Sequence, residues 1–347
     1  MLEDNLARIG KVKPDTILPP IYAAQWAYRH RARMSVNYVA KKGGVLVGFR
    51  ERKSSYVADM HSCEVLAGGV GQMIDALREV LSTLDIRNRI PQIEVAVGEH
   101  VTALVLRIME PLTANDEIKL KAFADAHLAE RIQWWLQVKG PETAVPWYPL
   151  DAPELTYDLP EYDIEINFRP TEFTQVNHGV NRLMVQRAMQ LLDPQPGEKI
   201  ADLFCGLGNF SLPIARLGAN VIGVEGSESL AQRAAENAAR NNLRERSTFF
   251  PADLYTDQEA AMKRVPKVSK MLIDPPRDGA MEVCNLLSRE LRPELTRIVY
   301  VSCSPGTLAR DAGVLVHSQG FTLRAAGVVN MFPHTAHVES IALFERD

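Results

Sequence analysis

From about residue 164 to the C-terminus, apolar strand-like runs alternate with amphipathic helix-like segments. The strand-like runs cover 199–204, 220–225, 247–251, 270–274 and 297–302, and helix-like segments cover 179–192, 210–217 and 227–242. This alternation constrains the fold, because consecutive parallel strands need a crossover connection, which is usually a helix. We therefore expect an α/β domain over residues 166–347, with a mostly parallel sheet and helices on both faces.

Residues 1–165 have a different pattern, which predicts a separate α+β domain. Helical spacing of apolar residues covers 72–84, two strands are expected within 91–109, and a second helix around 115–130. The stretch from Arg29 to Lys53 holds eight Lys or Arg residues against one acid, and its apolar residues alternate about a Lys-Gly-Gly turn at 42–44. This pattern predicts a basic β-hairpin.

A basic hairpin in an acidic chain is typical of a phosphate-binding surface, although the same charges can simply keep a solvated face soluble. The chain carries a formal net charge of −4, which is weak evidence against a nucleic-acid coat protein and permits a local basic patch. We expect this hairpin to contact RNA. The candidate residues are Arg29, Arg31, Arg33, Arg50 and Arg52.

Length and composition indicate a globular protein of two domains, since the chain has 347 residues, 46% of them hydrophobic and 24% charged. No run approaches the roughly 20 apolar residues that cross a bilayer, and the acidic start lacks the apolar stretch of a secretory signal. The four cysteines have no paired spacing, so we expect a reducing compartment, the cytoplasm, with Cys205 and Cys284 in structural positions. We expect a monomer with no membrane attachment and no obligate protein partner.

A glycine-rich turn follows the first strand of the α/β pattern, in Asp-Leu-Phe-Cys-Gly-Leu-Gly-Asn-Phe at 202–210. Gly206 and Gly208 allow a ligand to approach the backbone closely, and Glu225 ends the next strand, where an acid can bind ribose hydroxyls. A dinucleotide fingerprint needs a third glycine where this chain has Ser211, so a nucleoside without phosphates, such as S-adenosylmethionine, is favoured. Asp253, after the third strand, could bind an adenine amino group or cap a helix.

Two further strands end in reactive side chains. Asp274 follows one apolar strand and Cys303 follows another, so both are expected in the ligand crevice at the carboxyl edge of the sheet. A thiol in such a loop is a candidate nucleophile. Glu339 is expected at the start of the last strand and is a candidate base, with His334 and His337 as rivals. The His-x-x-His spacing alone is poor support for a metal site.

These motifs together resemble one family, the S-adenosylmethionine-dependent RNA uracil-5-methyltransferases, and most closely its branch acting on 23S ribosomal RNA. The resemblance rests on the turn at 202–210, Gln-Val-Asn at 175–177, Asp-Pro at 274–275, Ser-Cys-Ser-Pro-Gly-Thr-Leu-Ala-Arg-Asp at 302–311, the loop at 331–339 and the basic hairpin. It covers nearly the whole chain. It implies a class I, Rossmann-like methyltransferase domain at 166–347 behind an RNA-binding domain at 1–165.

The resemblance also implies site roles. Cys303 would add to C6 of uracil so that C5 can attack the methyl group, and Glu339 would then remove the C5 proton, giving 5-methyluridine. The residues expected around S-adenosylmethionine are Gln175, Phe204, Asn209, Glu225, Asp253 and Asp274. At position 253 the family pattern favours Asn, but Asp can also accept from an adenine amino group.

Two features of that branch are not matched by these residues. Its members usually begin with a small β-barrel RNA-binding domain, and they often hold an iron–sulfur cluster on four cysteines. Only Cys63 matches, as the fourth of those cysteines, and one thiol cannot hold a cluster, so we expect no cluster in this chain. We expect either a shortened member or a chain that lacks its front.

Alternative functions remain open at this point. The same chemistry could act on transfer RNA, or the chain could be a non-catalytic RNA-binding or assembly factor. Methylation of an adenine amino group is disfavoured, because that chemistry uses no cysteine and favours an aromatic residue where this chain has Arg277. Cytosine-5 methylation is disfavoured because its nucleophile typically follows a proline, whereas Cys303 follows Ser302.

Overall fold

A computed structural model describes residues 1–347, and the chain divides into two compact units. Unit 1 comprises Met1–Ala23, Asp158–Ile166 and Gly179–Asp347, and unit 2 comprises Ala24–Tyr157 and Asn167–His178. None of the helices is long and apolar enough to span a bilayer.

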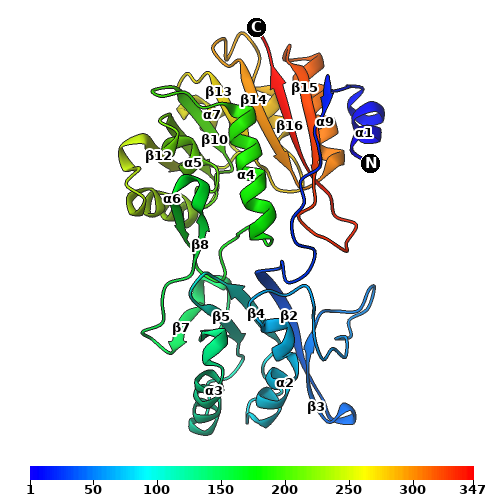
Figure 1. Ribbon diagram of the computed structural model, residues 1–347, viewed down its shortest axis with the longest axis vertical. Helices are drawn as coiled ribbons and strands as arrows, with labels where there is room; N and C mark the ends of the chain where they lie inside the picture. The colour runs from blue at the N-terminus through cyan, green and yellow to red at the C-terminus, as the bar shows by residue number, and fades with distance from the viewer. The chain divides into compact units, whose positions relative to one another are not determined.

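The α/β pattern of the second half of the chain is confirmed in unit 1, whose elements are labelled in Figure 1. The helices are α1 (Leu2–Asn5), α4 (His178–Leu192), α5 (Ser211–Arg216), α6 (Glu228–Arg240), α7 (Gln258–Arg264), α8 (Met281–Asn285) and α9 (Pro305–His317). The strands are β1 (Thr16–Ile17), β10 (Lys199–Leu203), β11 (Asn220–Glu225), β12 (Ser247–Pro251), β13 (Lys270–Ile273), β14 (Arg297–Ser302), β15 (Thr322–Val329) and β16 (Glu339–Glu345).

These eight strands form one sheet in the order β1-β15-β16-β14-β13-β10-β11-β12. The strands from β14 to β12 run parallel, and only β16 is antiparallel to its neighbours β14 and β15. The central strands β10, β13, β14 and β16 are almost continuously buried because helices cover both faces, as the apolar runs in the sequence indicate. The edge strands β1 and β12 contain no buried residue. The strand order reverses between β10 and β13, which makes their carboxyl ends a topological switch point.

The N-terminal segment does not lie with the rest of the first 165 residues. α1 and the adjoining helical turn η1 (Leu6–Gly10) pack against α9, where the His317 Nε2 atom lies 3.0 Å from the Gly10 carbonyl oxygen (Figure 1). β1 pairs in parallel with β15 and adds an eighth strand to the sheet. Burial of Leu2, Leu6 and Val12 in the core of unit 1 accounts for this placement, which the sequence pattern did not predict.

Unit 2 contains the expected hairpin and α+β pattern. Its strands are β2 (Arg31–Val39), β3 (Gly44–Gly48), β4 (Gln92–Val97), β5 (Thr102–Arg107), β6 (Ile132–Gln137) and β7 (Val145–Tyr148), which form a sheet in the order β3-β2-β4-β5-β6-β7. Its helices are α2 (Ile74–Thr83) and α3 (Ala114–Ala126), whose apolar sides share a core with the sheet (Figure 1). A capping box between Thr113 and Asp116 starts α3. A separate two-stranded sheet pairs β8 (Thr156–Leu159) with β9 (Ile164–Asn167).

Candidate functional site

The glycine turn after β10 has the backbone of a ligand-binding loop. Phe204, the first residue after the strand, has φ +63°, a region that few non-glycine residues adopt. Gly206 follows with φ +52°, and no atom lies within 4 Å of where its Cβ would stand. The turn therefore leaves open space for a ligand beside the backbone, and glycine is the residue that tolerates this conformation.

Glu225, at the end of β11, faces this turn. One of its carboxylate oxygens accepts a hydrogen bond from the Gly206 N–H at 3.0 Å, and the other accepts from the Ser227 N–H at 3.0 Å. These bonds hold the half-buried carboxylate beside the loop, and each oxygen keeps a lone pair for a ribose hydroxyl. The open cradle and the adjacent acid fit a nucleoside such as S-adenosylmethionine.

Asp253 is placed differently from Glu225. Its side chain is exposed, and it closes a local turn by accepting hydrogen bonds from the backbone N–H groups of Tyr255 and Thr256 at 2.7 and 3.1 Å. It also accepts from the Thr256 hydroxyl at 2.5 Å. These bonds lower the pKa of the carboxyl group, the Thr256 hydroxyl contributing most. The helix-capping alternative is wrong in detail, since Asp257 is the residue before α7.

Asn209 is held by a partner that the sequence analysis did not single out. Its amide and that of Asn181, on α4, exchange two hydrogen bonds of 2.8 and 2.9 Å. Asn181 is 1% exposed, so this pair fixes how the Asn209 amide is oriented. Gln175 belongs to unit 2, in the segment before α4, and stays a proposed ligand. Asn181 could have been noticed as a polar residue among the buried positions of α4.

The catalytic candidates Cys303 and Glu339 are brought together by the pairing of β14 with β16. β14 ends at Ser302, which is in register with Ser340 of the antiparallel strand β16. Cys303, the residue after β14, therefore comes close to Glu339, the first residue of β16, and the Glu339 charge acts on the Cys303 thiol. Cys303 is half-buried, whereas Glu339 is 4% exposed and its Oε2 atom has no hydrogen-bond partner.

The charged groups around Cys303 shift the pKa of its thiol in opposite directions. Burial, and then the carboxylates of Glu339 and Asp274, raise the pKa of the thiol, whereas the Arg277 guanidinium lowers it. Burial raises the pKa of Asp274 to about 7. Burial and the Asp274 charge raise the pKa of Glu339 to about 8. At neutral pH the resting site therefore favours a neutral thiol and a protonated Glu339.

These shifts predict a pH dependence. A raised pKa means that the basic form appears only as the pH rises through the folded-state value. Because both the thiolate and the Glu339 carboxylate are needed for the proposed reaction, kcat/KM should rise from pH 7 to 9, by about tenfold per unit or more. Methyl transfer to RNA at constant ionic strength measures this profile, and a rate that falls between pH 7 and 8 contradicts the assignment.

The five arginines chosen for RNA contact do not share one environment. Arg31 and Arg33 both face the buried carboxylate of Glu94, at 4.0 and 2.9 Å. Arg29 is half-buried, with its Nε atom lacking a hydrogen-bond partner. Arg50 and Arg52 are exposed and form no ion pair.

The remaining cysteines and the histidines of the last loop differ in their exposure to solvent. Cys205 and Cys284 are fully buried, and burial raises the pKa of both thiols. His334 and His337 are exposed on the loop before β16. No group of three His, Cys, Asp or Glu side chains could hold a metal ion, and Cys63 alone does not supply the ligands of an iron–sulfur cluster.

Two further residues face the site and were missed by the sequence analysis. Arg277 follows Asp274 by three residues, and its charge acts on Cys303. The ring of Tyr255 lies 5.6 Å from that of Phe204, and burial, followed by the charges of Asp278, Asp311 and Cys303, raises the pKa of its hydroxyl to about 12. A cation after Asp-Pro-Pro was visible in the sequence, but no local pattern marks Tyr255.

Comparisons with known proteins identify a family to which this chain is similar. Residues 149–347 match the family model described as tRNA (uracil-5-)-methyltransferase. Proteins named 23S rRNA (uracil(1939)-C(5))-methyltransferase RlmD are similar over the whole chain: that of Nitrosospira multiformis is 59% identical, with 78% of its length covered, and that of Chromobacterium violaceum is 56% identical, with 67% covered.

One solved structure shares the fold over nearly the whole chain. It is the tRNA (uracil-54, C5)-methyltransferase of Pyrococcus abyssi in complex with S-adenosyl-L-homocysteine. The TM-score is 0.72 at 22% identity, and the match covers 99% of this chain and 81% of that one. At this identity the likeness concerns the fold, and it extends over both units.

Proposed function

Because this chain belongs to the S-adenosylmethionine-dependent RNA (uracil-5-)-methyltransferase family, we propose that it methylates C5 of a uridine in 23S ribosomal RNA. The RlmD proteins that support this substrate are similar over the whole chain, including the part outside residues 149–347. The description of the family model makes transfer RNA the second candidate substrate.

The observation that carries the proposal is that Cys303, after β14, and Glu339, at the start of β16, come close together at the edge of the sheet that carries the glycine turn. A binding protein needs neither a half-buried thiol at a strand end nor, at the start of the neighbouring strand, a buried carboxylate with an unpartnered oxygen. A nucleophile and a base at adjacent positions are what methylation of a pyrimidine carbon requires, because C5 of uracil is itself a poor nucleophile. S-adenosylmethionine, when bound, supplies an electrophilic methyl group.

Cys303 is proposed to act first. Its thiolate adds to C6 of the uracil ring, which forms a C6–S bond and makes C5 an enolate-like carbon. C5 then takes the methyl carbon in line, and the electrons of the broken carbon–sulfur bond leave with the departing sulfur. Arg277 assists by stabilising the thiolate, since its positive charge lowers the pKa of Cys303.

Glu339 is proposed to act second. Its carboxylate removes the proton from C5, and the electron pair left behind expels the Cys303 thiolate from C6. The burial that raises the pKa of Glu339 to about 8 also makes its carboxylate a stronger base than one in water. A uridine in folded RNA must be extruded from its neighbours before the thiol can reach C6.

RNA contact is proposed for the loop that follows β3, together with the strand arginines named above. Residues 50–56 contain Arg50, Arg52 and Lys53 against a single acid, Glu51, and all four side chains are exposed. Tyr56 is 72% exposed in the same loop, where an aromatic ring can stack on an unpaired base. Cations that lack protein partners are free to bind phosphates.

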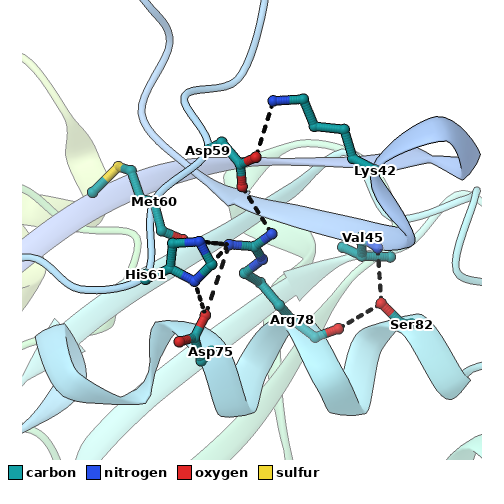
Figure 2. A network of polar contacts seen from close by, with 8 residues as sticks. All are labelled: Lys42, Val45, Asp59, Met60, His61, Asp75, Arg78 and Ser82. Atoms are coloured by element: carbon teal, nitrogen blue, oxygen red, sulfur yellow. Dashed lines mark hydrogen bonds and ion pairs between the residues drawn. The ribbon is translucent and has the colours of Figure 1, made fainter.

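A polar network holds the chain just after this loop. Figure 2 shows the Asp59 carboxylate between the Lys42 ammonium group and the Arg78 guanidinium, each at 2.9 Å. Arg78, on α2, also donates to the Met60 carbonyl at 2.7 Å. The network ties the end of the loop to the hairpin turn and to α2, and it neutralises an acid that would otherwise repel RNA.

The loop predicts a binding defect without a catalytic defect. Replacing Arg50 and Arg52 by glutamine should raise KM for RNA, leave kcat unchanged and lower the salt slope of binding by about one for each phosphate that is no longer bound. Tyr56→Ala should weaken binding by about 1–3 kcal/mol if the ring stacks on a base. Lys139→Gln is the matched control, because Lys139 is an exposed cation between β6 and β7, at the opposite edge of the sheet. An equal effect of the control would contradict a specific role for the loop.

The experiment that tests the function is methyl transfer from labelled S-adenosylmethionine to unmodified ribosomal and transfer RNA, with nucleoside analysis of the products. 5-Methyluridine in ribosomal RNA is the expected result. The same nucleoside in transfer RNA alone would keep the chemistry and overturn the substrate. S-adenosylmethionine binding with no transfer to either RNA would favour a non-catalytic factor.

A further inference from the structure

Asp311 lies on α9, eight residues after Cys303, and its carboxylate is fully buried. One of its oxygens accepts hydrogen bonds from the Tyr300 hydroxyl at 2.6 Å and from the Ala280 backbone N–H at 2.7 Å. Its other oxygen accepts from the Arg310 Nε at 2.8 Å. The carboxylate therefore joins α9, β14 and the end of the loop that follows β13.

Hydrogen bonds to three consecutive backbone positions hold the end of that loop, which comprises residues 274–280. Ala280 donates to Asp311, and the Asp278 carbonyl accepts from the Arg310 Nη2 at 2.7 Å. Between them, the Gly279 carbonyl accepts from the Tyr255 hydroxyl at 3.1 Å. A Cβ on Gly279 would lie 2.6 Å from the Asp311 carboxylate, and its φ is +77°, so only glycine permits this close packing.

The loop carries two charges that act on the thiol of Cys303 in opposite directions. Asp274 stands at its start, where its N–H donates to the Leu203 carbonyl at 3.3 Å, so β10 holds that end. Arg277 is exposed in the middle of the loop and forms no ion pair. The position of the Arg277 side chain relative to Cys303 therefore depends on how residues 278–280, at the end of the loop, are held.

We propose that Asp311 is a positioning residue for the methyl-transfer site, which holds the loop 274–280 so that Arg277 faces Cys303. Tyr300 lies three residues before Cys303, and Asp311 lies eight residues after it. The hydrogen bond between the Tyr300 hydroxyl and the Asp311 carboxylate therefore joins the chain on both sides of the thiol. This role deepens the proposed function and rests on it. The alternative is that Asp311 only stabilises the fold, as a buried and fully satisfied carboxylate does elsewhere.

The test is the pH titration of the Cys303 thiol by iodoacetamide, followed by mass spectrometry of its peptide. The charged groups that act on this thiol are Glu339 from β16 and Asp274 and Arg277 from the loop. The Tyr255 hydroxyl, from the segment after β12, is the remaining titratable group, and its pKa is raised to about 12. The half-buried thiol of Cys63, in unit 2, is the internal reference in the same sample. No RNA or S-adenosylmethionine is needed, so the readout does not depend on whether the proposed function is correct.

Two variants decide the outcome. Asp311→Asn replaces one accepting oxygen by an amide nitrogen, and Arg310→Gln removes the partly exposed link to the Asp278 carbonyl, so it serves if the first variant fails to fold. In both, loss of the Arg277 charge from the thiol should raise the pKa of Cys303, and alkylation at pH 8 should slow by about threefold to tenfold. The rate at Cys63 should be unchanged.

A reference variant separates positioning from simple destabilisation. Arg277→Gln should slow the alkylation of Cys303 by itself, and adding Arg310→Gln to it should have no further effect if both act through one charge. An unchanged Cys303 titration in folded Asp311→Asn or Arg310→Gln protein, with only a lower melting temperature, would overturn the proposal. So would fully additive effects in the double variant.

Discussion

Replacement of Cys303 by alanine should abolish methyl transfer, lowering kcat by about 10⁴-fold or more, because no other group can add to C6 of uracil. Cys205 and Cys284 are buried and cannot substitute, and Cys63 belongs to the other unit. S-adenosylmethionine binding should persist, since the glycine turn and Glu225 are untouched. Rates are measured with labelled S-adenosylmethionine, and binding by calorimetry.

RNA that contains 5-fluorouridine sharpens this prediction. Fluorine at C5 cannot be removed as a proton, so the wild-type protein should accumulate a covalent adduct on Cys303 that survives denaturing electrophoresis. Cys63→Ser is the matched control and should form the adduct normally. Turnover by Cys303→Ala at a rate near that of the wild type, or turnover by the wild type without an adduct, would contradict the covalent step.

Replacement of Glu339 by glutamine should stop the reaction one step later. Glutamine has nearly the same shape but cannot accept the C5 proton, so kcat should fall by about 10²- to 10⁴-fold. Because addition and methylation precede proton removal, ordinary RNA should now remain attached to Cys303. Denaturing electrophoresis followed by peptide mapping detects this adduct.

The controls for Glu339 address its rivals. His337→Gln should retain activity, because this exposed histidine lies on the loop before β16. Combining Glu339→Gln with Cys303→Ala should remove the adduct, which shows that it forms on the thiol. Near-normal turnover by Glu339→Gln would reject it as the base and return attention to His334 and His337.

Burial of the site affects the groups in both predictions. Burial keeps the carboxyl groups of Asp274 and Glu339 partly protonated near neutral pH, and the Asp274 charge adds to this effect on Glu339. This strengthens Glu339 as a base but also opposes ionisation of Cys303. Arg277 counteracts that effect, and the role proposed for Asp311 is to hold the loop that carries Arg277.

Local patterns predicted much of the fold and the centre of the site. Apolar runs bounded by turn residues predicted β10 to β14 to within about a residue, because periodicity and turn chemistry are properties of neighbouring residues. Cys303 and Glu339 could be chosen because each stands beside a strand end, where an α/β sheet binds its ligands. The expectation that Glu339 begins the last strand is confirmed.

Pairings between distant parts of the chain could not be predicted in this way. Glu94 pairs with Arg33 across 61 residues, so part of the positive charge in that row of arginines is already neutralised within the protein. Asp15 pairs with Arg324 across 309 residues, where the N-terminal segment joins the sheet beside β15. Such pairs depend on which elements become neighbours, and no local spacing encodes that choice.

The sequence by itself therefore determined the α/β sheet, the glycine turn and the two groups expected to do the chemistry, because each follows from residues close together in the chain. Only the tertiary structure decided how these groups affect one another. In the folded chain, Cys303 lies close to Glu339, and burial raises the pKa of both groups. Asp311 accepts a hydrogen bond from the end of the loop that carries Arg277. Electrostatic strength depends on distance and on exclusion of water, and both are fixed only when the chain has packed.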